Sequence, residues 1–420
     1  MYIKQIILKN IRGFEELDFD LKRADESYAG WTVFTGDNGS GKSALLKAIA
    51  VGLVGKETAR ALQPSFQGWI RNGVDCASIQ LFIQRDNLSG RRYYEDGNGE
   101  SLIIEIDLKK DNREETFITE NEDAKSSHDK CYSWFSCGYG PFRRIFGASA
   151  EATRQMIASD SEKFVTLFQE AASLAEVDQW LRSLHHKSLE NKLEARKKLQ
   201  LLIDILQDEL MPNQIKVDRV DSDGLWLRDK NGVELNWSDM SDGYRSALAL
   251  FADIFRHITN SALFLPHYDK NQDGTVCMEQ KGVVLIDEID AHLHPEWQQK
   301  IGFWLKRHFP NIQFLVTTHS PIICQAADDN GLFVLPEPGS HDQPKALSKE
   351  EYNKVIASRP DTILLTSAFG LQYTRSPRAV EGRIEYAKLK AKRRAGAQLT
   401  QEEEARMIQL EIFGENEEIL

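Results

Sequence analysis

The chain has 420 residues and a formal net charge of −12, from 52 lysines and arginines against 64 aspartates and glutamates. This acidic balance disfavours a protein that coats nucleic acid through phosphate neutralisation, although it leaves room for a local basic groove. Five scattered cysteines without a CxxC pair lead us to expect reduced thiols and no zinc site. Without a secretory signal pattern or an apolar run of about 18 residues, we expect no membrane span and a cytoplasmic protein.

The first 120 residues are predicted to be rich in strands. Residues 6–8 and 17–21 read as paired strands, and residues 31–35 form a third β-rich run that stops at Gly36. A helical spacing of apolar residues begins at residue 45. Three further β-like runs between Gly, Asn and Asp turns indicate an antiparallel sheet: residues 77–84, 102–108 and 116–118.

The rest of the chain combines helices with buried strands. The apolar runs at residues 283–287 and 314–318 are typical of buried parallel strands. The other predicted elements are one extended helix, a β-hairpin, a helix that begins at a proline, and a helical tail: residues 181–210, 215–235, 295–308 and 375–420.

These elements predict an α/β fold with a mixed or parallel core sheet, an antiparallel β subdomain and an inserted α-helical lobe with a short helical arm. We expect an N-terminal lobe, a helical insertion, a C-terminal lobe and a C-terminal helical region, at residues 1–149, 150–212, 213–335 and 336–420.

A P-loop stands between the run at residues 31–35 and the helix that follows it. Its glycines let backbone N–H groups curl around phosphate oxygens, and the helix directs its N-terminus at them. We expect Lys42 to reach the β- and γ-phosphates of ATP and Ser43 to ligate Mg²⁺. The motif consists of Gly36, Asp37, Asn38, Gly39, Ser40, Gly41, Lys42 and Ser43.

Two carboxylates end the apolar run at residues 283–287. Asp287 is placed to hold Mg²⁺ directly or through water, and Glu288 is the candidate general base for the attacking water. The alternative is an ordinary strand end with two solvated acids. The P-loop in the same chain favours the catalytic interpretation.

Two further segments are candidates for phosphate contacts. Ser241, the Gly243 amide and the start of a helical run would form an anion site, for which a plain helix N-cap is the alternative. Their place upstream of the Asp287 strand favours the anion site. His319 follows the run at residues 314–318, where an imidazole can touch a γ-phosphate, although a lone histidine would more often be structural.

The order of P-loop, Ser-x-Gly-x-Arg segment, Asp-Glu strand and strand-end histidine resembles the ABC-type ATPases of the RecF and structural-maintenance-of-chromosomes (SMC) kind. Over residues 1–335 the chain is most similar to short-armed AAA-family ATPases found with bacterial defence nucleases. These include the overcoming-lysogenization-defect proteins and the PtuA subunits of Septu-type antiphage systems.

The resemblance implies roles for further residues. Ser241, Gly243 and Arg245 would bind the γ-phosphate that a second copy holds. The segment after Glu288 would be the D-loop, in which Asp290 crosses the dimer interface. His319 would act as the switch histidine, and Arg12 would lie near the nucleotide.

Some features depart from these families. Residues 240–245 read Met-Ser-Asp-Gly-Tyr-Arg rather than the Leu-Ser-Gly-Gly-Gln of transporters, which argues against a transporter. The chain has no zinc hook and no Toprim-like acidic cluster after His319, so we do not expect it to be a nuclease itself. The Q-loop glutamine has competing candidates: Gln80, Gln84, and residues 138–141 with Arg143.

Other features have structural alternatives that we favour. Residues 269–280 imitate an EF-hand loop, but Gln280 stands where the closing Glu is required. His292 and His294 lie where the D-loop leads into a helix, which favours a structural role over a metal pair. Two basic runs are more typical of solvated helix faces than of nucleic-acid sites: residues 182–198 and 388–394.

The resemblance implies an ATPase that forms a head-to-tail dimer around two ATP molecules with Mg²⁺ and regulates or scaffolds a separate nuclease in antiphage defence. A RecF-like DNA-repair ATPase that acts on DNA directly is the alternative. A scaffold that binds ATP without turning it over is disfavoured, because such a protein need not keep both Glu288 and His319.

Overall fold

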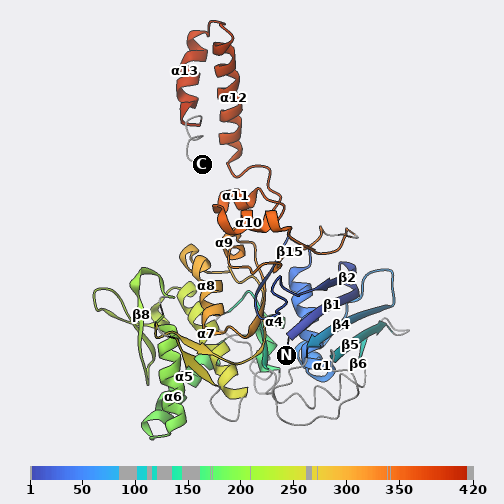
Figure 1. The fold of residues 1–420 in the computed structure, drawn as a ribbon, viewed down its shortest axis with the longest axis vertical. Helices are drawn as coiled ribbons and strands as arrows, with labels where there is room; N and C mark the ends of the chain where they lie inside the picture. Colours follow the sequence, from blue (N-terminus) through green and yellow to red (C-terminus); the bar gives the residue numbers. More distant parts are fainter. Residues whose placement is uncertain are drawn as a thin grey trace. The chain divides into compact units, whose positions relative to one another are not determined.

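A computed structural model gives the fold (Figure 1). It describes residues 2–84, 102–110, 116–120, 135–143, 161–170, 172, 174–208, 210–261, 267–271, 273–337, 339–340 and 342–413. The chain divides into two compact units, residues 1–357 and 358–420, while the four-segment division stays a prediction. Among the described residues, no helix combines the length and the apolar character that crossing a bilayer requires.

A six-stranded sheet forms the centre of the larger unit, in the order β16-β15-β3-β14-β13-β7. All neighbouring strands are parallel except β15 and β16. Every residue of β3, β13 and β14 is buried, as expected where both faces of a sheet are covered. The strands are β3 (Gly30–Thr35), β7 (Phe135–Tyr139), β13 (Gly282–Ile286), β14 (Ile312–Thr317), β15 (Leu332–Val334) and β16 (Lys345–Ala346).

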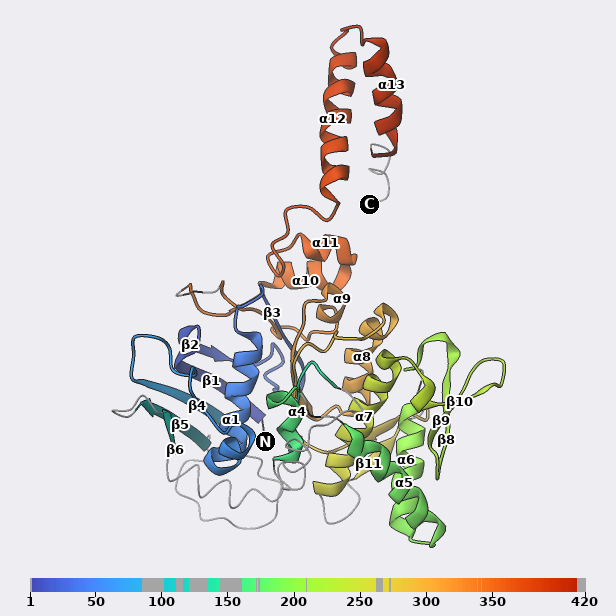
Figure 2. The ribbon, with the colours of Figure 1, turned by 180° about the vertical axis from the view of Figure 1, so that it is seen from behind.

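A five-stranded antiparallel sheet and helix α1 (Lys42–Leu62) cover one face of this core sheet (Figure 2). The apolar residues of α1 share one hydrophobic cluster with the antiparallel sheet and with Leu285 and Leu315 of the core sheet. Gln313 joins the two sheets, since its side-chain amide donates to the Ile3 carbonyl at 2.9 Å and accepts from the Ile3 N–H at 2.8 Å. The antiparallel strands, in sheet order, are β2 (Phe14–Asp20), β1 (Tyr2–Ile11), β4 (Cys76–Gln84), β5 (Leu102–Lys110) and β6 (Thr116–Glu120).

Helices α7 (Asp242–Ser261) and α8 (Pro295–His308) cover the other face. Successive strand residues point to opposite faces, so Trp31 lies on the α8 side while Phe34 belongs to the α1 cluster. Gly302 allows the close approach of α8, because a Cβ there would lie 3.1 Å from the Trp31 ring. The predicted parallel core, the antiparallel subdomain and the helix at residues 295–308 are confirmed.

The extended helix predicted for residues 181–210 is wrong. The structure has two helices, α5 (Ala175–Leu189) and α6 (Leu193–Leu206), that pack against each other as a hairpin. Asn191 lies between them with φ 59°, a left-handed conformation that asparagine tolerates better than most residues and that ends a helix. The short helices η1 (Glu162–Phe164) and α4 (Val165–Phe168) pack instead against β7, and α4 also contacts α1.

The β-hairpin predicted at residues 215–235 is confirmed and extended to three strands. These are β8 (Lys216–Asp221), β9 (Gly224–Arg228) and β10 (Glu234–Asn236), with η2 (Pro212–Gln214) before them and η3 (Trp237–Asp239) after them. The remaining elements of the larger unit are β11 (Tyr268–Lys270), β12 (Val276–Met278), α9 (Pro321–Cys324) and α10 (Lys349–Ala357).

The smaller unit is helical, as predicted for the tail. It contains α11 (Pro360–Leu364), α12 (Pro377–Arg394), α13 (Gln401–Leu410) and η4 (Glu411–Phe413), with α12 and α13 side by side (Figure 1). The Thr400 side chain accepts from the Glu403 N–H at 3.2 Å and begins α13 with a capping box. Lys392 of the basic run pairs with Glu403 at 2.7 Å, and the rest of that run is exposed.

Candidate functional site

Four neighbouring parallel strands bring the predicted motifs to one edge of the core sheet. The carboxyl ends of parallel strands meet at the same edge, and open α/β sheets bind ligands there. The P-loop follows β3, His319 follows β14, and Asp287 and Glu288 follow β13. Residues 140–143 follow β7 at the same edge. The structure therefore assembles segments that lie up to 283 positions apart in the sequence, from Gly36 to His319.

The P-loop leads directly from β3 into α1. Gly39 and Gly41 have φ 82° and 91°, conformations that side chains rarely adopt. A Cβ on Gly41 would also lie 2.3 Å from the Phe14 ring. The Lys42 ammonium donates to the carbonyls of Gly36 and Asp37, both at 2.8 Å, so the lysine bridges the loop.

Lys42 is the electrostatic centre of this edge. Burial lowers the pKa of Lys42, and four carboxylates oppose that effect: Asp287, Glu288, Asp37 and Asp290. These carboxylates create a negative potential at this edge, which a bound divalent cation would neutralise. The role of the strand-end acids in holding Mg²⁺ stays a prediction.

Asp287 is buried and oriented by its neighbours. Its backbone N–H donates to the Tyr139 carbonyl at 2.8 Å, and its carboxylate accepts from the Thr317 hydroxyl at 2.6 Å. Thr317 also accepts from the Glu288 N–H at 2.7 Å. Glu288 has φ 45°, a left-handed conformation, so the turn directs its side chain differently from an extended strand.

Asp290 and His319 belong to one hydrogen-bonded unit. The Asp290 carboxylate accepts from the Thr318 hydroxyl at 2.5 Å and from the His319 N–H at 3.3 Å. The His319 side chain is exposed at the sheet edge. Asp290 thereby ties the turn after β13 to the strand end that carries the histidine.

Arg12 lies in the tight turn between β1 and β2. Its backbone N–H donates to the Trp69 carbonyl at 2.7 Å, and its guanidinium lies over the Trp69 ring at 5.0 Å. Burial lowers the pKa of Arg12. Burial lowers the pKa of Lys47 most, and the positive charge of Arg12 lowers it further. Arg12 therefore faces α1, the helix that follows the P-loop.

Ser241, Gly243 and Arg245, named the signature residues, lie at the start of α7 beside the turn after β13. A Cβ on Gly243 would lie 2.5 Å from the His292 carbonyl, so glycine permits this contact. Arg245 turns back to its own helix start, donating to the Ser238 carbonyl at 3.2 Å and pairing with Asp242. Ser241 is exposed.

A shallow pocket opens at this helix start. Its lining contains Ser241 and Gly243 and no residue of the P-loop, within the part of the chain that the structure describes. The other lining residues are Asn213, Tyr244, His292, Leu293, His294 and Trp297. Within one chain, the P-loop therefore does not contribute to this pocket.

Sequence reasoning underestimated Arg143, which it weighed only as part of a Q-loop candidate. This arginine is 2% exposed, and its guanidinium donates to five backbone carbonyls at 3.0–3.2 Å. Burial lowers its pKa to about 10, against the opposing charges of Asp290, Asp287 and Glu288. Gln80 is bound instead to Glu105 at 2.7 Å within the antiparallel sheet.

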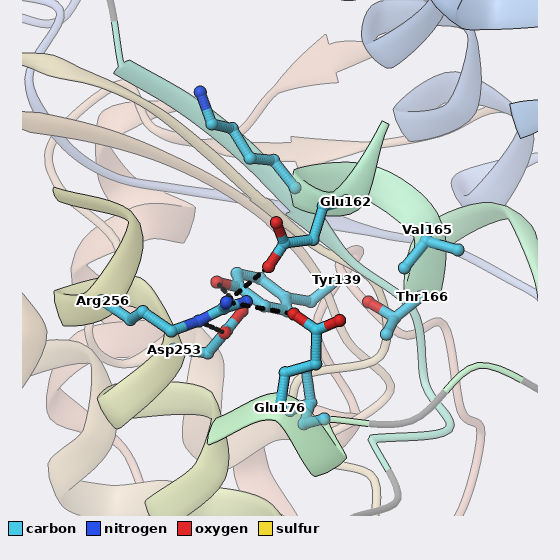
Figure 3. A pocket seen from close by; sticks show the side chains of 9 residues that line it. Tyr139, Glu162, Val165, Thr166, Glu176, Asp253 and Arg256 are labelled. Carbon is cyan, nitrogen blue, oxygen red and sulfur yellow. Dashed lines mark hydrogen bonds and ion pairs between the residues drawn. The ribbon is translucent and has the colours of Figure 1, made fainter. Parts of the chain in front are cut away.

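A buried ionic cluster was also missed (Figure 3). Arg256 of α7 lies between Glu162, Glu176 and Asp253, and Asp253 accepts from the Tyr139 hydroxyl at 2.9 Å. Although burial alone would raise the pKa of Asp253, the neighbouring His257 and Arg256 lower it. Spacing of i, i+3 and i+4 among Asp253, Arg256 and His257 was the available sequence signal. The cluster links the signature helix to the end of β7.

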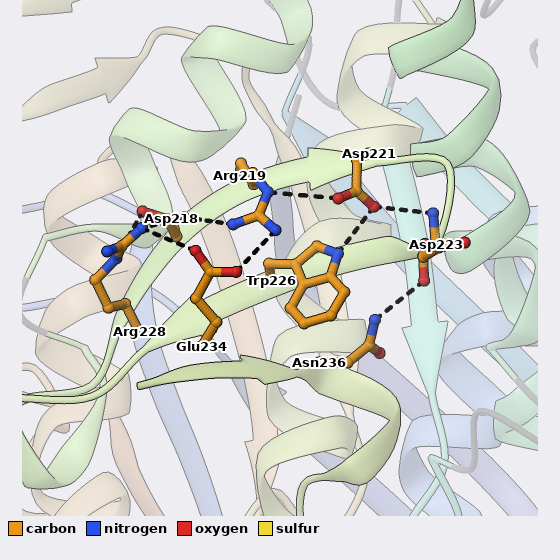
Figure 4. A network of polar contacts seen from close by, with 8 residues as sticks. All are labelled: Asp218, Arg219, Asp221, Asp223, Trp226, Arg228, Glu234 and Asn236. Atoms are coloured by element: carbon orange, nitrogen blue, oxygen red, sulfur yellow. Dashed lines mark hydrogen bonds and ion pairs between the residues drawn. The ribbon is translucent and has the colours of Figure 1, made fainter. Parts of the chain in front are cut away.

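The small sheet β8–β9–β10 carries a polar network on one face (Figure 4). Arg219 pairs with Asp218 at 2.9 Å and with Glu234 at 3.0 Å, and it stacks over Trp226 at 5.0 Å. Arg228 pairs with Asp218 at 3.1 Å. Since carboxylates neutralise both arginines, this face does not form a basic groove for nucleic acid.

The two metal-like features have structural roles. The His294 ring accepts from the Glu296 N–H at 3.3 Å and caps α8. Asn271, Asp273 and Gly274 lie between the paired strands β11 and β12, and Asp273 pairs with Arg307 at 2.5 Å. No group of three potential metal-ligating side chains occurs among the described residues.

The residues present fit a magnesium nucleotide. The Ser40 hydroxyl is buried and has no hydrogen-bond partner in the described part of the chain, which suits a loop that receives an anion. Lys42 supplies one ammonium against the four surrounding carboxylates. Ser43 and Asp287 are hard oxygen donors of the kind that Mg²⁺ prefers.

This arrangement defines a P-loop nucleotide-binding protein with an α/β core. The chain belongs to the family described as "AAA domain, putative AbiEii toxin, Type IV TA system", which matches residues 31–325.

Among individual proteins, the chain resembles the Septu protein PtuA of Bacillus mycoides, with 28% identity over 381 residues, or 89% of this chain and 45% of that protein. The "Retron Ec83 probable ATPase" of Escherichia coli is 44% identical over 119 residues, or 28% of this chain and 20% of that protein. The chain thus spans less than half the length of these relatives. The SMC head domain from Thermotoga maritima overlays with a TM-score of 0.46 at 15% identity, covering 83% of this chain and 100% of that one.

Proposed function

We propose that this chain binds ATP on the P-loop and hydrolyses it at the carboxyl edge of the core sheet. The observation that carries the proposal is the convergence of the P-loop, Asp287, Glu288 and His319 at the ends of three neighbouring parallel strands. A Gly-rich loop alone would be a weaker argument, because it lacks the strand-end acids.

Each residue has a chemical role in the proposal. Lys42 leaves the loop carbonyls to bind the β- and γ-phosphates, and the loop N–H groups bind the remaining oxygens. Ser43 and Asp287 hold Mg²⁺, which when bound neutralises charge on the phosphates. Glu288 takes a proton from the attacking water, and His319 contacts the γ-phosphate.

We further propose that the active site is completed by a second copy of the chain. Ser241, Gly243 and Arg245 would face the γ-phosphate of the partner, and Asp290 would lie at the interface. The support is the separation of the signature pocket from the P-loop, together with the exposure of Ser241. A composite site makes turnover depend on dimer formation, so ATP acts through its higher affinity for the closed dimer.

Mixing two inactive variants tests the composite site. Lys42→Ala removes the phosphate contact in one copy, and Ser241→Arg blocks the signature in the other. A mixture should regain roughly a quarter of the wild-type rate, since half of random dimers carry one intact site of two. A mixture that stays inactive would exclude the composite arrangement.

Hydrolysis itself is tested by steady-state turnover over a range of protein concentrations, with and without double-stranded DNA. A rate per subunit that rises with concentration and ignores DNA supports the dimer. A rate that DNA raises many-fold would favour the RecF-like DNA-repair alternative. No hydrolysis in the presence of bound ATP would contradict the proposed activity.

We also propose that the chain acts in antiphage defence and regulates a separate nuclease subunit. The support is the similarity to a Septu protein and to a retron ATPase. The proposal is tested by co-purification from the native host with the products of neighbouring genes. Full defence activity from this chain without any partner would contradict it.

A further inference from the structure

Three candidate residues lie in a turn that is conformationally unfavourable by itself. The turn after β13 carries Asp287, Glu288 and Asp290, and two of its residues are left-handed: Glu288 with φ 45° and His292 with φ 66°. For residues other than glycine this conformation costs roughly 1–2 kcal/mol each. Bonds from outside the turn must therefore stabilise it.

Arg143 supplies four of these bonds. One terminal nitrogen donates to the Asp287 carbonyl at 3.0 Å, and the other to the carbonyls of Glu288, Ile289 and Ala291 at 3.1–3.2 Å. Four carbonyls of five consecutive residues thus point at one planar group. A guanidinium can satisfy them because its donors diverge in a fixed fork, which the single ammonium of lysine cannot reproduce.

Both terminal nitrogens of Arg143 are occupied by this task. Its first terminal nitrogen also donates to the Gly140 carbonyl at 3.0 Å, and the side chain is 2% exposed. Such an arginine does not reach a phosphate, in contrast to an arginine that stabilises a transition state directly. Its effect on the chemistry passes through the turn that it holds.

The segment that carries Arg143 is itself fixed at its amino end. The Tyr139 carbonyl accepts from the Asp287 N–H at 2.8 Å, and the Tyr139 hydroxyl reaches Asp253 of the signature helix at 2.9 Å (Figure 3). A Cβ on Gly140 would lie 2.2 Å from the Thr166 carbonyl, so the backbone packs closely on α4. Residues 139–143 therefore connect the helix with Ser241 to the turn with Glu288.

We infer that Arg143 is a positioning residue for ATP hydrolysis: it holds the backbone of residues 287–291 so that Glu288 faces the nucleotide and Asp290 keeps its bonds to Thr318 and His319. The inference rests on the proposed hydrolysis. Because the P-loop does not depend on Arg143, loss of this residue should affect turnover far more than ATP binding.

The test compares Arg143→Lys and Arg143→Gln with the wild type, measuring ATP affinity and kcat separately. Arg143→Gln introduces no buried charge, so it provides a second variant if Arg143→Lys fails to fold. Arg23→Lys is the matched control, since Arg23 is 5% exposed and bonds to Asp328 and to Thr32 at the amino end of β3.

We expect kcat to fall about 100-fold in both Arg143 variants, the effect of an ångström-scale misplacement, with ATP affinity changed less than about two-fold. Arg23→Lys should lower the melting temperature without this separation of kcat from affinity. Wild-type kcat in a folded Arg143 variant, or an equal loss of affinity and kcat, would overturn the inference. A wild type that binds ATP without turnover would instead overturn the proposed hydrolysis, and the inference with it.

Discussion

Replacing Gly243 by alanine tests the contact between the signature helix and the D-loop. The new Cβ would lie 2.5 Å from the His292 carbonyl, whereas real Cβ atoms essentially never come within 3.0 Å of another heavy atom. The two backbones must therefore separate by at least the difference, 0.5 Å. Neither can move freely, because the Tyr244 and Trp297 rings pack in a tilted pair with centroids 4.7 Å apart, and Arg143 holds the turn before His292.

Overpacking of this kind typically costs about 1–3 kcal/mol, and we expect Gly243→Ala to lower the free energy of unfolding by that amount. Urea denaturation followed by tryptophan fluorescence measures it as a lower midpoint at an unchanged slope. ATP affinity should persist, since no P-loop residue lines the pocket at Gly243, while turnover should fall with the displaced signature.

Gly13→Ala is the matched control for stability, because a Cβ at Gly13 meets nothing within 4 Å and its φ is not left-handed. It should unfold at nearly the wild-type urea concentration. If Gly243→Ala also unfolds there, the close approach of α7 and the D-loop is not a real constraint, and the reasoning is refuted.

Three further predictions concern the site and its supporting cluster. Lys42→Ala should weaken ATP binding about 10–100-fold, since a charge-assisted hydrogen bond contributes about 1.5–3 kcal/mol; unchanged affinity in calorimetric titration would contradict the role of the lysine. Glu288→Gln should bind ATP normally and hydrolyse it about 100–10,000-fold more slowly, accumulating dimers visible by light scattering, and full turnover would exclude Glu288 as the base. Asp253→Asn should lower the free energy of unfolding by roughly 3 kcal/mol at neutral pH, because Arg256 loses one buried partner. Because the pKa of Asp253 is lowered in the folded protein, its ionised carboxylate stabilises the fold at pH values above the unfolded pKa of about 3.9. This stabilisation is lost as the pH falls below that value, so the free energies of unfolding of the variant and the wild type should converge in acid; a constant difference would refute this.

Most of the helices and strands could be predicted from the sequence, because each depends on residues that are neighbours in the chain. The P-loop needs glycines at fixed spacing, and residues 283–287 are apolar enough to specify a buried strand. The helix that begins at Pro295 follows from the fixed φ of proline at a first helical position. The predicted single helix at residues 181–210 failed because the break depends on one left-handed residue, Asn191, within an otherwise helical composition.

The residue pattern alone predicts the kind of chemistry: a phosphate-binding loop, a pair of strand-end carboxylates and a histidine, in an order typical of an ATPase. The fold was needed to show which strands are neighbours and therefore that these motifs share one edge. The fold also places the Arg143 guanidinium in hydrogen bonds with the backbone after β13, and Gly243 in contact with His292. Backbone carbonyls are the same in every residue, so no side-chain pattern could reveal an arginine that binds them across more than 140 positions.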